Sequence, residues 1–491
     1  MKRRNFCISA LAAGAATLPL SRFAAAAGDD IAAMSGAGKQ LTLSTTEVKD
    51  FAAGLRGQLL LPEQDGYEAA RKVWNGAFDK RPALIARCAG AADVQRAVDF
   101  GRTHGLLLAV RGGGHSLSGQ STCDGGMMID LSPMHSVQVD PLAKSARVEP
   151  GALLGDLDRE AQAFGLATPA GTVSHTGVAG LTLGGGYGRL ARKFGLTCDN
   201  LTAAEVITAD GKFVRASGKE NADLFWGLRG GGGNFGVVTS FTYQLHPVEP
   251  IVFGGALIFP ATQAREVLKF WADYARAAPD DFYAEAILTR GPGGMPALVF
   301  DVCHCGPREQ AERDLKPLRQ AGKASVDALA PISYVDLQRS GDGTTPHGRS
   351  YYIKSGYMSR IEPALIDVGL ELLATAPMAG FGLIMVHHGG AIARVKPGAT
   401  AVPLRDPLHS VVLNTAWEGK ADADKNVAWA RDAWRKLEPL TNGYYVNTAN
   451  ADDPQKRVRD SYGMNYGRLA ALKRKYDPAN LFHLNANIRP A

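Results

Sequence analysis

Glycine is distributed unevenly along this chain, and this distribution is the feature that most constrains the fold. Of the 57 glycines, the densest groups form three blocks between Gly112 and Gly236. The first block follows a short apolar run, Leu106–Val110, which has the length and composition of a buried strand. Its three consecutive glycines begin at Gly112 and leave backbone N–H groups unshielded and free to adopt positive φ. Such a backbone can wrap around a phosphate or pyrophosphate.

The residues around these glycines fit the same kind of ligand. Arg111 can add a charge-assisted contact to an anion, and His115 would lie against whatever the anion carries. Ser116 and Gly119 complete the loop. A glycine-rich turn taken alone is more often only a turn, so the loop by itself leaves both interpretations open.

The second block spans Thr168–Gly188. Its last part, from Gly177 onward, holds six glycines whose spacing fits neither a helix nor a regular strand. A backbone this bare can approach a flat ligand closely.

The third block, Phe225–Phe241, satisfies the dinucleotide-binding pattern through Gly231, Gly233 and Gly236. A Rossmann turn must follow a strand and open a helix. Here a helix-like run precedes the glycines and a strand-like run follows them. The order is reversed, so we reject the Rossmann interpretation.

Residues 1–27 have the composition of an export signal. Arg3 and Arg4 precede a modest apolar stretch, and four alanines offer a cleavage site before Gly28. The paired arginines are typical of the twin-arginine route. The apolar stretch is too short for a membrane anchor and contains Gly and Pro. We therefore expect a periplasmic or secreted protein with no membrane span.

Composition excludes two other classes. The formal net charge is +6, but the signal contains four basic and no acidic residues, so the mature chain is close to neutral and gives no indication of a nucleic-acid partner. Cys303, His304 and Cys305 resemble metal ligands, yet a strand-like run leads into them and no second ligand pair lies at zinc spacing. We predict no metal site.

Strand-like and helix-like runs alternate through the chain, which predicts an α+β fold. In the first half the expected strands are 82–87, 106–110, 127–131, 145–148, 201–208 and 237–245, and the expected helices are 91–104, 152–164 and 221–228. Farther along, the expected strands are 251–258, 284–288, 297–302, 382–387 and 410–417, and the expected helices are 261–278, 308–320, 362–375 and 423–437.

Three glycine blocks in one domain, none of them Rossmann-like, point to a family. RGGGHS, the PAG…GGGYG block from Pro169 to Gly188 and FWGLRGGGGNFGVV resemble the berberine-bridge-enzyme-like branch of the vanillyl-alcohol-oxidase flavoproteins, as does Ser461–Pro490 near the C-terminus. The resemblance implies a two-piece PCMH-type FAD-binding domain, residues 28–250 and 443–491. Between the pieces it implies a substrate domain, 251–442, in which helices cover an antiparallel sheet.

The resemblance also implies how the cofactor is held. The first glycine loop would bind the FAD pyrophosphate, and His115 would be bonded covalently to the flavin. Many relatives add a cysteinyl link two residues after PAG, where this chain has Val173, so we expect a single link. The implied cofactor contacts are Arg111, Gly112, Gly113, Gly114, His115, Ser116, Gly119, Gly171, His175, Gly177, Gly180, Gly185, Gly188, Val238 and Asn485.

The implied chemistry is oxidation of a C–H bond next to an O–H or N–H group, with a base that removes the proton. Tyr187 of GGGYG and Tyr445 are the catalytic candidates. Tyr445 belongs to a tyrosine-rich segment expected to return to the FAD domain as a strand, where a second tyrosine of some relatives is Thr448 here. Tyr352 and Tyr444 remain further candidates for the base.

Three residues of the substrate domain, His387, His388 and Trp417, are candidates for substrate contact. The expected function is oxidation of a small alcohol, sugar or alkaloid-like substrate, with O₂ as the usual acceptor and H₂O₂ as the product. An exported dehydrogenase with another electron acceptor, and a flavin-free binding protein on the same fold, are the alternatives.

Overall fold

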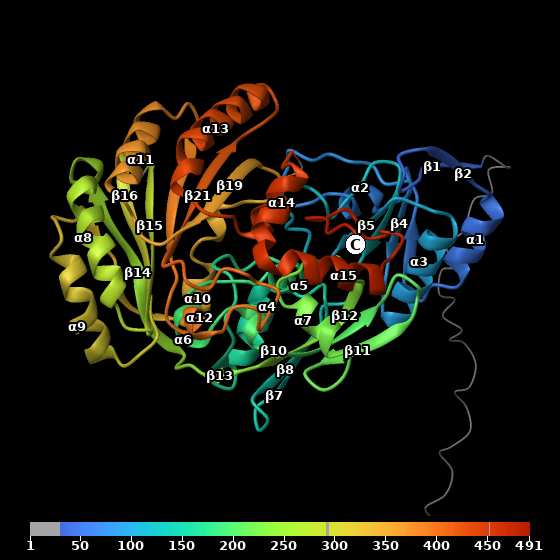
Figure 1. Cartoon of the computed structure of the whole chain (residues 1–491), viewed down its shortest axis with the longest axis horizontal. Helices are drawn as coiled ribbons and strands as arrows, with labels where there is room; N and C mark the ends of the chain where they lie inside the picture. The colour runs from blue at the N-terminus through green and yellow to red at the C-terminus, as the bar shows by residue number, and fades with distance from the viewer. Residues whose placement is uncertain (1–29, 291–293, 451) are drawn as a thin grey trace, which may run out of the picture.

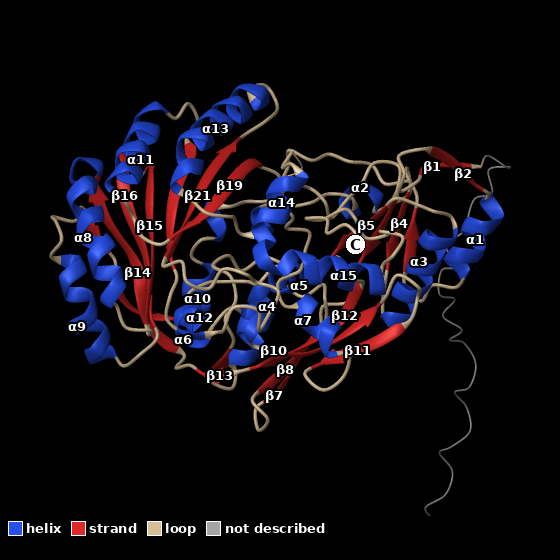
Figure 2. Ribbon diagram, in the orientation of Figure 1, coloured by secondary structure: helices blue, strands red, loops and turns tan. Residues whose placement is uncertain are grey.

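The computed structural model describes residues 30–290, 294–450 and 452–491, which form two lobes side by side (Figure 1). The expected export signal at residues 1–27 lies outside the described residues. Helices lie on the faces of separate sheets (Figure 2), which confirms the α+β prediction. No helix in the described ranges is both long and apolar enough to cross a bilayer.

The first lobe begins with a small mixed sheet. Its strands, in sheet order, are β3 (Gln58–Leu60), β4 (Leu84–Arg87), β6 (Met127–Asp130) and β5 (Leu108–Arg111). Both β4 and β5 pair with β6 in parallel. The first glycine block therefore starts at the carboxyl edge of parallel strands, the usual place for ligands in such sheets. Helices α1 (Thr45–Ala53) and α3 (Ala91–Thr103) contribute buried side chains to the same core.

A second sheet of this lobe is antiparallel. Its strands, in sheet order, are β11 (Phe213–Ser217), β10 (Leu201–Ile207), β12 (Val237–Gln244), β8 (Ser145–Val148) and β7 (Val137–Asp140). Around it lie the shorter elements α2 (Tyr67–Ala70), α4 (Leu154–Gln162), α5 (Val178–Leu183), α6 (Ala191–Phe194), α7 (Ala222–Leu228), β1 (Ile31–Met34), β2 (Gln40–Leu43), β9 (Leu166–Ala167) and β13 (His246–Pro247).

The second lobe is built on a large antiparallel sheet. Its strands, in sheet order, are β17 (Val326–Asp327), β14 (Ile251–Pro260), β16 (Pro296–His304), β15 (Phe282–Arg290), β20 (Gly380–His387), β21 (His409–Trp417) and β19 (Ser350–Met358), and β18 (Ala330–Ser333) pairs with β14. Helices α8 (Ala264–Ala277), α9 (Arg308–Arg319), α11 (Pro363–Thr375) and α13 (Ala423–Leu437) cover its outer face (Figure 1). Two short helices, α10 (Tyr334–Arg339) and α12 (Ala391–Arg394), complete the lobe. The inner face of the sheet is directed toward the first lobe.

The chain then returns to the first lobe through α14 (Gln455–Tyr462) and α15 (Tyr466–Tyr476). A buried cation fixes this return. The Lys473 ammonium lies 2.6 Å from the Asp477 carboxylate and donates to the carbonyls of Asn234 and Phe482, each at 2.8 Å. Because a buried charge is stable only when it is paired and hydrogen-bonded, these bonds tie the last segment to the third glycine block.

Three local expectations are wrong. The second glycine block contains a helix, α5, because Val178, Thr182 and Leu183 bury one side of it while the glycines stay at its edges. The segment around Tyr445 is a loop with a 3₁₀ turn at Val446–Thr448, not a strand. Strand β19 was missed, because its Lys354 and Ser355 interrupt the apolar pattern.

Candidate active site

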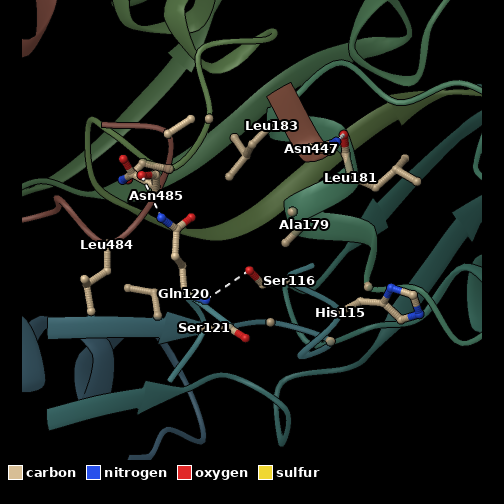
Figure 3. Close-up of a pocket in the computed structure, with 18 of the residues that line it drawn as sticks. His115, Ser116, Gln120, Ser121, Ala179, Leu181, Leu183, Asn447, Leu484 and Asn485 are labelled. Carbon is tan, nitrogen blue, oxygen red and sulfur yellow. Dashed lines mark hydrogen bonds between the residues drawn. The ribbon is translucent and has the colours of Figure 1, made fainter. Parts of the chain in front are cut away.

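A cavity of about 370 Å³ lies where the glycine blocks meet the C-terminal segment (Figure 3). Nine of the expected cofactor contacts line it: Gly112, Gly113, Gly114, His115, Ser116, Gly177, Gly180, Val238 and Asn485. Tyr445 lines it as well. These ten residues come from five separate stretches of sequence, and the fold brings them to one space.

The glycines at this cavity allow two backbones to pack together without side chains between them. A Cβ atom on Gly113 would lie 2.4 Å from the Cα atom of Gly177, and one on Gly112 would lie 2.7 Å from the carbonyl oxygen of Pro150. Gly114 has φ of 69°, which favours glycine. By contrast, a Cβ on Gly180 would meet nothing within 4 Å. Glycine is therefore required for packing on one side and leaves open space on the other.

The other expected contacts lie outside the cavity lining. Gly171 and Gly188 pack against backbone or core side chains, and Gly185 has φ of 120° beside the ring of Tyr445. Gly119 has φ of 63° at the end of the loop. Arg111 donates to the carbonyl of Ala70, and its Nε lies 3.8 Å from a carboxylate oxygen of Asp130. Its contact with an anion therefore stays a prediction.

His115 is held by aromatic neighbours at the end of the first glycine block. The Trp74 ring stacks on its imidazole at a centroid distance of 4.2 Å. Nε2 of His115 lies 3.1 Å from Nδ1 of His175, and the His347 ring is 4.9 Å from that of His175. Burial, and then the neighbouring His175 and His347, lower the pKa of His115 to about 3. The imidazole is therefore neutral at physiological pH.

Polar atoms at the cavity lack partners within the protein. Ser121 Oγ and Asn485 Oδ1 are buried without a hydrogen bond in the described structure, although both residues line the cavity. Gln120 crosses this region: its backbone N–H donates to Ser116 Oγ and its side-chain amide to the carbonyl of Asn485, both at 3.1 Å (Figure 3). Buried polar groups without partners are rare, so these atoms point to a polar ligand. Sequence reasoning missed Gln120 and Ser121, which carry no motif.

Two tyrosines meet beside the cavity: Tyr445 lines it, and Tyr187 lines a smaller pocket that Tyr445 also borders. The Tyr445 ring lies 4.7 Å from that of Tyr187, which in turn contacts His388 edge-on at 5.0 Å. The hydroxyl of Tyr445 accepts a hydrogen bond from the backbone N–H of Gly186 at 3.1 Å and one from the Asn447 amide at 2.6 Å. Burial raises the pKa of Tyr187 and of Tyr445. Both phenols therefore keep their proton at neutral pH and can donate a hydrogen bond.

A carboxyl group faces this tyrosine pair from the inner face of the large sheet. Tyr187 packs against the cluster of Tyr283, Val386 and Val412, and the Tyr283 hydroxyl donates to Glu285 at 2.5 Å. Burial, and then the charge of Asp301, raise the pKa of Glu285 to about 7. The sequence held one weak signal for this residue, a single acid inside the otherwise apolar run of β15.

An apolar row crosses the inner sheet face beside Glu285. Strand register places Ile258 opposite Val299, Val299 opposite Ile287, and Ile287 opposite Ile384. These four side chains are only half-buried, whereas the outer-face residues between them are buried under helices. Ile384, at one end of the row, packs against the same cluster as Tyr187, so the row reaches the tyrosine pair.

Three expected substrate or base candidates lie on the outer side of the large sheet, and a fourth, Tyr444, lies in the loop that follows α13. Nε2 of His387 lies 2.9 Å from the Ala275 carbonyl of α8 on the outer face. Successive side chains of a strand point to opposite faces, so the neighbouring His388 is on the inner face. Tyr352 and Trp417 pack with Ala430 of α13, and Tyr352 donates to Asp452. The Tyr444 ring lies against Arg457 at 4.7 Å. The alternation of side chains along a strand decides the positions of His387, Tyr352 and Trp417.

The Cys303-His304-Cys305 run has structural contacts. Cys303 is buried in a small hydrophobic cluster, and His304 Nε2 lies 3.0 Å from Asp314 Oδ2. Within the part of the chain that the structure describes, no three metal-ligating side chains gather.

Comparison with known proteins identifies the family. A model described as an FAD binding domain matches residues 82–217, and one described as berberine and berberine like matches 444–489. An FAD-linked oxidoreductase of Dictyostelium discoideum is 32% identical over 452 residues, which are 91% of this chain and 98% of that protein. The chain belongs to the berberine-bridge-enzyme-like FAD-linked oxidoreductases.

Two further members of this family show how much of the chain is shared. The (R)-6-hydroxynicotine oxidase of Paenarthrobacter nicotinovorans is 32% identical, with 89% of this chain and 97% of that protein covered. The crystal structure of 6-hydroxy-D-nicotine oxidase from Arthrobacter nicotinovorans superposes with a TM-score of 0.82 at 31% identity, over 89% of this chain and 98% of that one. This chain is therefore an FAD-linked oxidoreductase, and its glycine-lined cavity with unpartnered polar atoms fits that cofactor.

Proposed function

We propose that this chain is an exported oxidase that removes hydride from a C–H bond next to an O–H or N–H group of a small apolar substrate. When bound, FAD supplies the hydride acceptor and passes the electrons to O₂, giving H₂O₂. The observation that carries the proposal is one cavity lined by the glycine cradle, His115 and Tyr445, whose ring contacts that of Tyr187.

The residues that would hold the cofactor have distinct roles. The cradle around Gly112 and Gly177 would bind the pyrophosphate, with Ser121 and Asn485 offering the buried polar atoms. His115 would form a single covalent link to the flavin. Among the described residues that line the cavity there is no cysteine, which supports the absence of a second link.

The residues around the substrate would orient it and take its proton. Tyr187 and Tyr445 are protonated and can donate hydrogen bonds to a substrate heteroatom. Glu285, with a pKa near the working pH, has the property that a general base requires. We assign proton removal to Glu285, through Tyr283 or directly.

The sheet face indicates the substrate class. Relatives are named for a hydroxynicotine, for xylooligosaccharides and for chitooligosaccharides. Binding of a sugar requires many hydrogen-bonding side chains, whereas the row from Ile258 to Ile384 offers none. This supports a small apolar alcohol or amine.

Acid precipitation of the purified protein tests the cofactor. Flavin that stays in the wild-type pellet but leaves the pellet of His115→Ala supports the covalent link, whereas flavin released from the wild type contradicts it. No flavin in either fraction would favour a flavin-free binding protein. Turnover with O₂ compared with an artificial acceptor then separates an oxidase from an exported dehydrogenase. Fractionation of cells that express the full chain tests export.

A further inference from the structure

The bond between His115 and His175 has a consequence for covalent attachment. His175 was expected to touch the flavin, but it does not line the cavity, and its imidazole instead bonds to that of His115. Its Nδ1 lies 3.1 Å from Nε2 of His115. The bond thus occupies Nε2 of His115, and in the described structure no other residue bonds to Nδ1 of this cavity-lining histidine.

The direction of this hydrogen bond decides which nitrogen of His115 can react. In a neutral imidazole one nitrogen carries the proton and the other carries a lone pair. If Nε2 of His115 donates to His175, the lone pair of His115 lies on Nδ1. The opposite direction would leave a proton on Nδ1 and no nucleophile facing the cavity. A low pKa keeps His115 neutral in both cases.

The position of His175 is fixed by its own neighbour. The backbone N–H and the hydroxyl of Ser174 both donate to the Asp342 carboxylate of the other lobe, at 2.9 and 2.6 Å. On the opposite side, Trp74 prevents the His115 ring from turning away by stacking on it. The two imidazoles are therefore held at hydrogen-bond distance by contacts from both lobes.

We propose that His175 is the positioning residue for flavin attachment: it accepts the Nε2 proton of His115, so that Nδ1 forms the bond to the flavin methyl carbon. This rests on the proposed covalent link. As that bond forms, one C–H bond of the methyl group and the N–H bond of His115 break. The two electrons enter the flavin ring, which serves as the oxidant, and O₂ restores its oxidised form.

A matched pair of variants tests this role. Leucine and asparagine have nearly the same shape, but only asparagine places an acceptor oxygen near the position of the histidine Nδ1. Loss of a positioning hydrogen bond slows a step by about tenfold, so His175→Leu is expected to hold about tenfold less acid-stable flavin than the wild type at equal expression time. His175→Asn is expected to recover most of it.

Two further measurements separate the possible results. Total flavin, read from the visible absorbance of each purified protein, reports whether the variant still folds and binds the cofactor, and His347→Ala controls for loss of a nearby imidazole that does not bond to His115. Acid-stable flavin in His175→Leu equal to the wild type would overturn the proposal, as would an Asn variant no better than the Leu variant. A wild type without acid-stable flavin would instead contradict the covalent link itself. Attachment at Nδ1 is read from NMR of the flavin peptide.

Discussion

The glycine cradle and the large sheet are built in opposite ways. The cradle depends on the absence of side chains: Gly113 and Gly177 let two backbones touch, and bare main chain forms the wall of the cavity. The inner sheet face works by the side chains themselves, with Glu285 and the row from Ile258 to Ile384. Under the proposed function, the cradle sets which cofactor binds, whereas the sheet face sets which substrate is oxidised.

The largest expected effect is in the cradle. Gly113→Val places a side chain against the backbone of Gly177, which cannot move as a flexible side chain could, and we expect a loss of roughly 3 kcal/mol or more of folding stability together with the bound FAD. The measurement is thermal unfolding with flavin content. Gly218→Ala is the control, because its Cβ would meet nothing within 4 Å. A folded, flavin-loaded Gly113→Val protein would show that the two backbones are not in tight contact.

A smaller effect, on catalysis alone, is expected on the sheet. Glu285→Gln keeps the shape and the acceptor for Tyr283 but cannot take a proton, so kcat/KM should fall by about 100-fold. In the wild type the activity should decline as pH falls below about 7, because the raised pKa of Glu285 protonates the base there. The pH profile of kcat/KM checks both statements. Glu205→Gln, which removes a carboxylate paired with Arg147 on the other lobe, should leave the profile unchanged.

The same group should also affect stability. The pKa of Glu285 is raised in the folded state, so the folded protein binds more protons than the unfolded chain between the two pKa values. Its stabilising contribution is complete below about pH 4.5 and is lost as pH rises through about 7. Glu285→Gln should therefore be more stable than the wild type above neutral pH, by on the order of 3 kcal/mol, with no gain near pH 4. Equal pH dependence in both proteins would mean that Glu285 is not desolvated.

The smallest effect is expected in the apolar row. Ile384→Asn replaces an aliphatic contact with an amide and should raise KM for an apolar alcohol or amine about tenfold while kcat changes little. Ile384→Val keeps the aliphatic character and serves as the control. A lower KM for sugars in the wild type than for apolar substrates would contradict the assigned substrate class.

The cradle could be predicted from the sequence because glycine carries its own signal. A residue without a side chain has few other reasons to occur three times in succession, so the first loop and the neighbouring strands were located correctly. The sheet face could not be read in this way. His387 and His388 are adjacent, yet they lie on opposite sides of β20, and only the pairing of strands fixes which of the two is turned inward.

Polar residues that are satisfied by distant partners caused the other errors. Lys354 in β19 lies 2.5 Å from Asp453, and Ser355 bonds to Thr448 at 2.5 Å. Both partners lie on the returning C-terminal segment, far away in sequence. The local sequence of β19 therefore contains charged and small polar residues, although the folded chain has a buried strand there.

The order of synthesis adds a timing constraint to the cavity. One wall is formed by the first glycine block, and another by Phe482, Leu484 and Asn485. At typical ribosome speeds the second wall is made roughly half a minute after the first. A nascent chain can therefore fold its first sheet early, but it cannot enclose the dinucleotide until translation has reached this last wall. Enclosure of the cofactor thus requires a fully translated chain.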